Sequence, residues 1–320
     1  MYFDAHSDIW GDITQRRLDG ETNVFHRRHY EKFVKGGIEG SFFVIWVDPP
    51  YDADYAKRTG EIMQAIRDES RECSDYQIVR NYEEMMAAKE AGKIYVFIGV
   101  EGMAYVGEDL SKIDEYYEFG AREGMLCWNE SNALASGASS GIYEGLTDTG
   151  KAAVKKMQDL GMIVDVSHLN VAGFWDIMDL ATAPVIASHS NASALCAHQR
   201  NLTDDQLKAI AATGGVVGLN AYNQFIDLDP RKSNVRRLAE HAYHMADVMG
   251  IDHVGCGFDF IDIFDSGESF NDNGYFTDGL RSCTEVPALF SCLEELGFSK
   301  EDRDKIAYGN FQRVVKEVLK

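Results

Sequence analysis

The chain lacks long apolar runs. None of its 320 residues belongs to a stretch approaching the roughly 20 apolar residues that a membrane-spanning helix requires. The first residues, Met1-Tyr2-Phe3-Asp4, enter a strand-like segment at once, without the basic and then apolar segments of a secretory signal peptide. We therefore expect no membrane partner and no secretion.

Cysteine is sparse and irregularly spaced. The six cysteines include no Cys-x-x-Cys pair. Two of them, Cys127 and Cys256, lie inside apolar runs, where buried free thiols are common. A reduced, cytoplasmic protein is the simplest interpretation.

Basic charge is also scarce. The chain has 31 lysines and arginines against 52 acidic residues, which gives a formal net charge of −21. Such a balance argues against nucleic acid or an anionic membrane as a partner. The composition, 45% hydrophobic and 26% charged, is ordinary for a globular protein that can bury a large core.

Linkers and internal repeats are missing as well. No Pro- or Ser-rich tract, low-complexity segment or short-period repeat interrupts the chain, so we expect one domain over residues 1–320. An early glycine-rich phosphate loop is absent too. That absence disfavours a doubly wound open sheet, the main alternative among folds with parallel strands.

Short, almost uninterruptedly apolar segments recur along the chain and are typical of strands buried on both faces. They are residues 2–5, 41–47, 94–100, 124–128, 162–166, 184–188, 215–219 and 253–257. Helical patterns separate them, for example at residues 54–73, 111–122, 148–160, 170–181, 203–213 and 233–249. This alternation predicts a (β/α)8 TIM barrel, an α/β fold of parallel strands.

Two local signals support these elements. Thr203 with Gln206 three residues later has the spacing of a capping box, and Gly161 follows a predicted helix as a stop signal. The polar stretches 129–147, 220–235 and 260–284 all follow strands. We expect these stretches to be loops or lids over an active face.

Several predicted strands end on a residue that can bind a metal. His6 and Asp8 are two apart in an extended segment and point the same way, although the pattern alone also fits a surface pair. Glu101 ends the third strand, where a salt bridge across the barrel mouth is the alternative. His168 and His189 each follow a serine at the ends of consecutive strands, an equivalence that favours metal ligation over a hydrogen-bonded histidine.

This ligand set is larger than one metal needs. Two Zn²⁺ ions sharing Glu101 as a bridge would use all five residues. The remaining positive charge would favour a bridging hydroxide, because bound metals lower the pKa of water. The pattern therefore predicts metal-assisted hydrolysis at a binuclear zinc site.

Two further residues complete the candidate site. Asp259 ends the eighth strand, where it would serve as a general base and then as an acid, or else as a structural carboxylate. Arg200 follows the sixth strand by a short loop, where it could bind a substrate carboxylate, or else be a surface arginine.

The chain resembles the membrane (renal) dipeptidase family, zinc peptidases of the amidohydrolase-like superfamily. The resemblance spans residues 4–314, and its motifs are Asp4-Ala5-His6-Ser7-Asp8, Gly99-Val100-Glu101-Gly102, Asp165-Val166-Ser167-His168, Ser188-His189-Ser190, His198-Gln199-Arg200-Asn201-Leu202, Gly257-Phe258-Asp259-Phe260 and Tyr308-Gly309-Asn310-Phe311-Gln312-Arg313-Val314.

The resemblance implies a role for each of these residues. His6 and Asp8 would hold one zinc ion, His168 and His189 the other, and Glu101 would bridge them. Arg200 would bind the substrate carboxylate and Asp259 would transfer protons. The family cleaves dipeptides, including some with a D-residue on the C-terminal side, and its members are often homodimers.

The fourth strand departs from the family pattern. Better-known members carry there a histidine that contacts the scissile carbonyl oxygen, whereas this chain has Trp128-Asn129. Both residues are therefore candidate substrate contacts, since each offers an N–H donor. The small residues 136–141 nearby would shape the pocket or form a surface loop. Tyr222 matches an aromatic residue that the family uses near substrate, or it serves packing.

The leading hypothesis is a zinc-dependent dipeptidase acting through a metal-bridging hydroxide on a small, dipeptide-like substrate. The missing histidine motivates an alternative, an amidohydrolase acting on N-acyl amino acids or other small carboxylate-bearing amides. A metal-binding barrel that hydrolyses no amide is the third hypothesis, which the complete ligand set disfavours.

Overall fold

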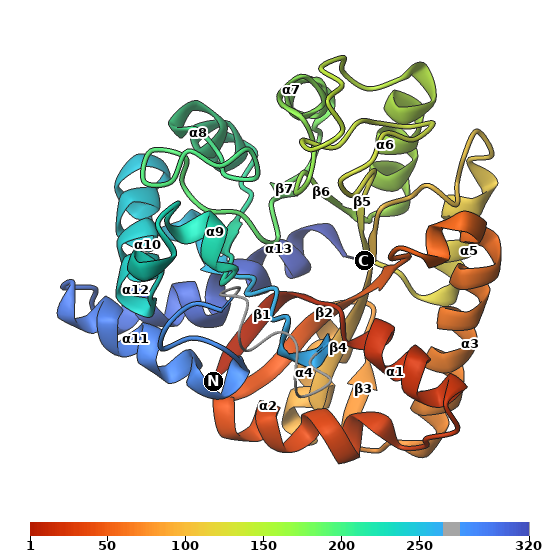
Figure 1. Cartoon of the computed structure of the whole chain (residues 1–320), viewed down its shortest axis with the longest axis horizontal. Coiled ribbons are helices and arrows are strands. Elements are labelled where there is room, and N and C mark those ends of the chain that lie inside the picture. The colour runs from red at the N-terminus through yellow and green to blue at the C-terminus, as the bar shows by residue number, and fades with distance from the viewer. Residues whose placement is uncertain (265–275, 320) are drawn as a thin grey trace.

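The computed structural model describes residues 1–264 and 276–319, so residues 265–275 of the predicted 260–284 loop lie outside the described chain. Parallel strands occupy the centre of the molecule and helices surround them (Figure 1). The predicted (β/α)8 arrangement is confirmed.

Each of the eight predicted strand segments contains a strand. The described strands are β1 (Tyr2–Ser7), β2 (Ile38–Trp46), β3 (Tyr76–Ile78), β4 (Ile94–Glu101), β5 (Glu123–Met125), β6 (Ile163–Asp165), β7 (Val185–Ile186), β8 (Val217–Leu219) and β9 (Val254–Cys256). The short strand β3 was not predicted. It pairs with β4 at residues 94–96, on the edge opposite β2.

The barrel is less regular than the repeat predicts. One sheet runs in the order β1-β2-β4-β5-β6-β7, and β8 pairs with β9 in a second sheet. A parallel bridge between Ala187 and Val217 joins the two sheets. Among the described residues no strand pairing joins β9 to β1, and the Phe258 N–H instead donates to Asp4 Oδ1 at 2.8 Å. A buried side chain therefore replaces a backbone ladder at this seam.

Side chains alternate between two apolar layers, as expected for strands buried on both faces. In β4, Tyr95 and Phe97 belong to the cluster that fills the barrel, whereas Val96 and Ile98 pack under the helices. Helix α13 (Asn310–Val318) closes the floor of the barrel with an apolar stripe at helical spacing, namely Phe311, Val314, Val315 and Val318. The floor of the barrel is thus packed with apolar side chains.

The predicted helices are present within three residues at each end. They are α3 (Tyr55–Glu72), α5 (Ser111–Phe119), α6 (Asp148–Leu160), α7 (Val171–Leu180), α8 (Asp204–Ala212) and α10 (Val235–Met249). The remaining helices are α1 (Ile9–Leu18), α2 (Glu31–Gly36), α4 (Tyr82–Glu90), α9 (Asn223–Ile226), α11 (Val286–Glu295), α12 (Lys300–Asp304) and α13.

Local capping explains where several helices begin and end. Thr203 and Gln206 form the predicted capping box at the start of α8. Gly161 ends α6 in the left-handed region with φ 74°, which glycine adopts without strain. No helix in the described part of the chain is long and apolar enough to cross a membrane.

Candidate metal centre and active-site pocket

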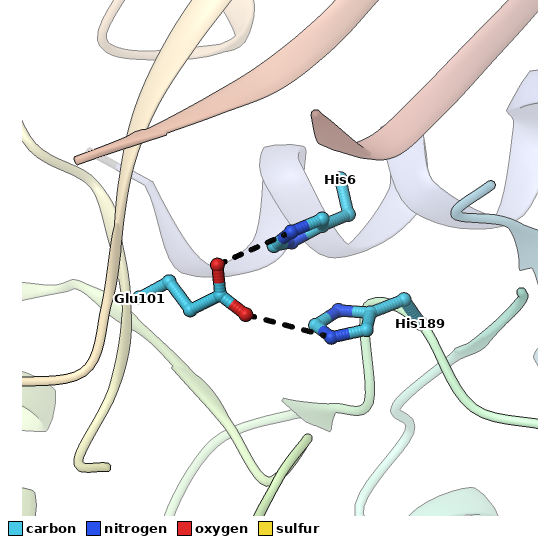
Figure 2. Close-up of side chains that lie close together, drawn as sticks. All are labelled: His6, Glu101 and His189. Atoms are coloured by element: carbon cyan, nitrogen blue, oxygen red, sulfur yellow. Dashed lines mark ion pairs between the residues drawn. The ribbon is translucent and has the colours of Figure 1, made fainter. Parts of the chain in front are cut away.

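The predicted ligands meet at the mouth of the barrel, where the strands end. Glu101 lies at their centre, with Oε1 2.8 Å from His168 Nε2 and 3.8 Å from His189 Nε2. Its Oε2 is 3.5 Å from His6 Nε2. Figure 2 shows the Glu101 carboxylate between the rings of His6 and His189, with one oxygen directed at each. His6, Glu101 and His189 place ligand atoms within 4.8 Å of one another.

A second group of ligand atoms also includes His6. The Nε2 atom of His6 is 3.8 Å from Asp8 Oδ1 and 3.9 Å from Asp259 Oδ1. These three residues also place ligand atoms within 4.8 Å of one another. The two groups share His6.

The acidic groups of the centre create an electrostatic environment that favours a bound cation. Burial by itself would raise the pKa of Glu101, but the neighbouring His6 and His168 hold that pKa well below its usual range. Burial also lowers the pKa of His168, to about 3, and that of His189, so both imidazoles are neutral. His6 differs, because Glu101, Asp8 and Asp259 outweigh its burial and raise its pKa well above the usual value. Three carboxylates converging on one ring are thus the dominant electrostatic feature.

Unsatisfied polar atoms show that the donor set fits a metal. Among the described residues, both ring nitrogens of His6 and Asp8 Oδ1 are buried without a hydrogen-bond partner. Buried polar atoms of this kind are costly unless a ligand satisfies them. Imidazole nitrogens combined with carboxylate oxygens are the usual ligands of zinc.

The two other histidines are oriented by their second nitrogens. His168 Nδ1 lies 3.1 Å from Asn129 Oδ1, and His189 Nδ1 lies 2.7 Å from Ser188 Oγ. If these Nδ1 atoms carry the protons, both Nε2 lone pairs face the centre, where they lie 2.9 Å apart. A cation beside them would relieve the resulting repulsion, as in metal sites whose histidines are held by outer hydrogen bonds.

Backbone strain coincides with the site. Besides Asn23, the positive-φ residues other than glycine in the described chain are His168, with φ 70°, and Asp259, with φ 57°. Left-handed backbone is uncommon for such residues and persists where the surrounding structure enforces it. Both strained residues direct functional groups into the same mouth.

Asp259 is held beside the centre by one amide. Asn220 Nδ2 donates to Asp259 Oδ2 at 3.0 Å, while Oδ1 faces His6. Burial raises the pKa of Asp259 to about 6, despite the opposing effect of His6. A carboxyl group with a pKa near neutrality can both accept and return a proton.

Arg200 is a buried cation that lines the same pocket as Asp259. It is only 5% exposed, and its Nη2 donates a long hydrogen bond of 3.5 Å to the His189 carbonyl oxygen. Its Nε has no hydrogen-bond partner within the described residues. The guanidinium lies 5.5 Å above the Phe225 ring and lines the main pocket. A carboxylate in that pocket would supply the missing acceptor.

The pocket has a volume of about 330 Å³. It is lined by Asp8, Trp46, Glu101, Trp128, Asn129, Ser139, His168, His198, Gln199, Arg200, Tyr222, Gln224, Phe225, Asp259 and Ile261. His6 and His189 do not line it, because they lie deeper. Each of the three predicted loops contributes a lining residue, such as Ser139, Phe225 and Ile261.

The three candidate substrate contacts, Trp128, Asn129 and Tyr222, all line the pocket but have different neighbours. Trp128 faces Trp46, with ring centroids 5.2 Å apart, and forms an aromatic wall. Asn129 lines the pocket, but its Oδ1 contacts His168, so it also orients a predicted ligand. Tyr222 packs against Phe225 at 4.9 Å and lines the pocket as well.

Two residues near the chemistry escaped the sequence prediction. Trp46 ends β2 and lines the pocket, and Asn220 follows β8 and holds Asp259. Both stand at strand ends, where the candidate metal ligands also lie, so their position along the chain is the signal that could have identified them.

The model of the membrane dipeptidase family, peptidase family M19, matches residues 1–320. The chain belongs to this family. A dipeptidase family member is a metal-dependent hydrolase of a small substrate, so the predicted family, fold class and enzyme class are confirmed.

Similar proteins extend the comparison. An uncharacterized dipeptidase of Schizosaccharomyces pombe is 29% identical over 95% of this chain and 75% of its own length. An uncharacterized Klebsiella pneumoniae protein is 36% identical over 69% of this chain and 79% of its own length. A metallopeptidase of Rhodobacter sphaeroides, solved with a phosphinate mimic of the dipeptide L-Ala-D-Ala, has a TM-score of 0.87 at 25% identity and covers 99% of both chains.

Proposed function

We propose that this family member hydrolyses dipeptides with two zinc ions at the mouth of its barrel. The observation that carries the proposal is the position of Glu101, whose two oxygens face different histidines. One carboxylate so placed can serve two cations at once. The orphaned atoms of His6 and Asp8 support the same assignment.

The donor set divides into two halves. His6 and Asp8 would hold one ion, His168 and His189 the other, and Glu101 would contribute to both. When bound, the ions would polarise the scissile carbonyl group and acidify a water molecule. Asn129 and Ser188 would keep the rings of His168 and His189 in the orientation that binding requires.

The buried side chain of Arg200 would orient the substrate. Arg200 would bind the C-terminal carboxylate, because its guanidinium has a free Nε donor among the described residues and lines a pocket of this size, which favours a planar anion. That anchor would place the peptide bond over Glu101, with Asp259 in reach to take a proton and return it to the leaving amine. The dipeptide mimic bound by the Rhodobacter sphaeroides relative supports a D-residue at the C-terminal position as an acceptable substrate.

The test is a kinetic comparison of Arg200→Met with the wild type. We expect kcat/KM for L-Ala-D-Ala to fall by about 100-fold, since charge-assisted hydrogen bonds contribute about 1.5–3 kcal/mol each. Hydrolysis of the corresponding dipeptide amide, which has no carboxylate, should change little. Arg236→Met, which removes an exposed arginine paired with Glu295, is the matched control. Equal losses on both substrates would contradict the proposed anchor.

The second candidate substrate class is the N-acyl amino acids. Trp128 and the His168-bound Asn129 favour it, because neither reproduces a histidine beside the scissile carbonyl. Such substrates keep the carboxylate for Arg200 but lack the free N-terminal amine. Hydrolysis of N-acetyl amino acids together with inertness toward a panel of dipeptides would select this class.

We also propose that the protein is cytoplasmic. All six cysteines lie within the described chain and none is in a disulfide, which suits a reducing cytoplasm. Thiol alkylation in freshly lysed cells should therefore modify six free cysteines after denaturation.

The homodimer implied by the resemblance to the dipeptidase family stays a prediction. Sedimentation velocity of the purified protein tests it.

A further inference from the structure

Beneath the metal centre lies a glutamate for which the proposed chemistry has no use. Glu123 begins β5, is 0% exposed and points into the barrel against β4. A Cβ atom added at Gly99 would lie 2.1 Å from Glu123 Oε2, so the glycine makes room for this carboxyl group. Within residues 1–264 and 276–319, neither of its oxygens has a hydrogen-bond donor. An ionised carboxylate left in that state would be strongly destabilising.

The neighbour of Glu123 is a second buried carboxyl group. Glu123 pairs with Ile163 of β6, and Asp165 lies two residues further along β6, on the same face of the sheet, and is also 0% exposed. Two carboxyl groups this close cannot both be ionised in a dry interior, so they share a proton. Burial and then the charge of Asp165 raise the pKa of Glu123 well above its usual value.

The backbone decides which group keeps the charge. Asp165 Oδ1 accepts the Ser167 N–H at 2.7 Å and the Ser188 N–H at 3.2 Å. Donors of this kind stabilise a carboxylate. No donor among the described residues reaches Glu123, so it is the neutral partner and Asp165 is the acceptor beside it.

Asp165 leads directly to a predicted metal ligand. The Ser188 N–H that it binds belongs to the residue whose Oγ lies 2.7 Å from His189 Nδ1. The Ser188 N–H lies 3.2 Å from both oxygens of Asp165, so the Asp165 carboxylate faces Ser188. Because its proton can go to Asp165, Ser188 Oγ is free to accept one from His189 Nδ1. His189 Nε2 then keeps a lone pair for a metal.

We propose that Glu123 is a positioning residue for the metal centre, which as a neutral carboxylic acid donates to Asp165 and so fixes Ser188 and the imidazole of His189. The inference rests on the proposed function in one respect, namely that His189 binds zinc. It assigns a role to two acidic residues that touch neither substrate nor metal. Metal affinity, more than the chemical step, is what this chain of contacts would control.

The test compares two substitutions of Glu123 in the full-length protein. Glu123→Gln keeps an N–H donor toward Asp165, whereas Glu123→Met has similar length without a donor. We expect Glu123→Met to weaken zinc binding by about 10–100-fold, as measured by chelator competition with the metal-depleted protein. Glu123→Gln should stay within about 3-fold of the wild type, a rescue that a merely structural role for the side chain would not produce.

Two further variants keep the test decisive. Ser188→Ala removes the acceptor of His189 and leaves the carboxyl pair in place, so it should weaken zinc binding like Glu123→Met even if that variant folds poorly. Glu69→Met is the matched control, because Glu69 is equally buried but pairs with Arg17 and the Phe25 N–H. It should lower thermal stability and leave zinc affinity of the folded protein unchanged.

The outcomes separate this inference from the proposed function. Unchanged zinc affinity in Glu123→Met, or an equal loss in Glu123→Gln, overturns the positioning role, whether or not the enzyme hydrolyses dipeptides. A wild type that binds zinc tightly but cleaves no dipeptide overturns the proposed substrate and leaves the positioning role standing, provided that the Glu123 variants behave as expected.

Discussion

We expect Glu101→Gln to remove most of the bound metal and to lower kcat/KM for a dipeptide by more than 100-fold. Loss of a residue that only supports a metal ligand typically costs about 10–100-fold in affinity or activity, so the loss of a shared ligand costs more. Glu101 is the residue that both groups of ligands approach, through His6 on one side and through His168 on the other. Its amide replacement keeps the size and removes the charge.

The electrostatic consequence strengthens this expectation. Among the neighbours that raise the pKa of His6, the negative charge of Glu101 has the largest effect. With a neutral glutamine, the centre retains Asp8 and Asp259 but loses the carboxylate between the histidines. Affinity should therefore fall for both ions, not for one alone. Metal analysis of the purified variant beside steady-state kinetics measures both effects.

A matched control distinguishes the loss of a carboxylate at the site from the loss of a negative charge elsewhere on the protein. Glu108→Gln removes an exposed carboxylate from the loop that follows the same strand, and it should leave metal content and kcat/KM unchanged. A Glu101→Gln variant that holds full metal, or that hydrolyses dipeptides at the wild-type rate, contradicts the shared-ligand assignment.

Asp259→Asn is expected to lower kcat by about 10²–10⁴-fold, the usual contribution of a positioned acid or base. The structural reason is its place at the pocket wall, where Asn220 holds one oxygen and leaves the other toward the centre. An asparagine keeps the shape and one carbonyl oxygen but cannot carry a proton between water and the leaving amine. KM should change by no more than a few-fold, because Arg200 still anchors the carboxylate.

Metal content decides between two roles for this residue. Asp259 lies in the ligand-atom group of His6 and Asp8, so a metal-binding role is the competing account. If Asp259 transfers protons, the asparagine variant keeps its metal while kcat falls. Loss of metal in parallel with kcat would instead make Asp259 a ligand. Asp252→Asn, at an exposed aspartate paired with Lys305, is the control for a change of charge.

The meeting of the candidate ligands could be predicted from sequence because of how parallel strands converge. His6, Glu101, His168 and His189 follow separate apolar runs, and their meeting requires only that the carboxyl ends of those runs share one mouth. The same rule applied to every residue type would have added Trp46 and Asn220.

Other features depend on contacts that no local pattern encodes. In the sequence, Glu123 does not differ from other acidic residues near strands. Its contacts with Asp165 and Gly99 form only when the barrel folds. The seam between β9 and β1 depends on Asp4 accepting from Phe258, two residues at opposite ends of the chain. Strand β3 is too short, at three residues, for its alternation to stand out.

Asn129 shows how a correct position can carry a different contact. The residue was chosen as a substrate donor in place of a histidine, and it does line the pocket. Its carbonyl oxygen, however, faces His168 Nδ1 at 3.1 Å. A backbone with φ 70° at His168 brings the ring there, and such a backbone angle is not readable from the sequence around it.

Zinc titration of the metal-depleted protein, followed by dipeptide hydrolysis at each point, tests the central claim most directly. The account predicts that the depleted enzyme is inactive, that activity returns as zinc is added, and that binding saturates at two ions per chain. Saturation at one ion would contradict the binuclear centre. Full hydrolysis by the metal-free protein would contradict the proposed mechanism altogether.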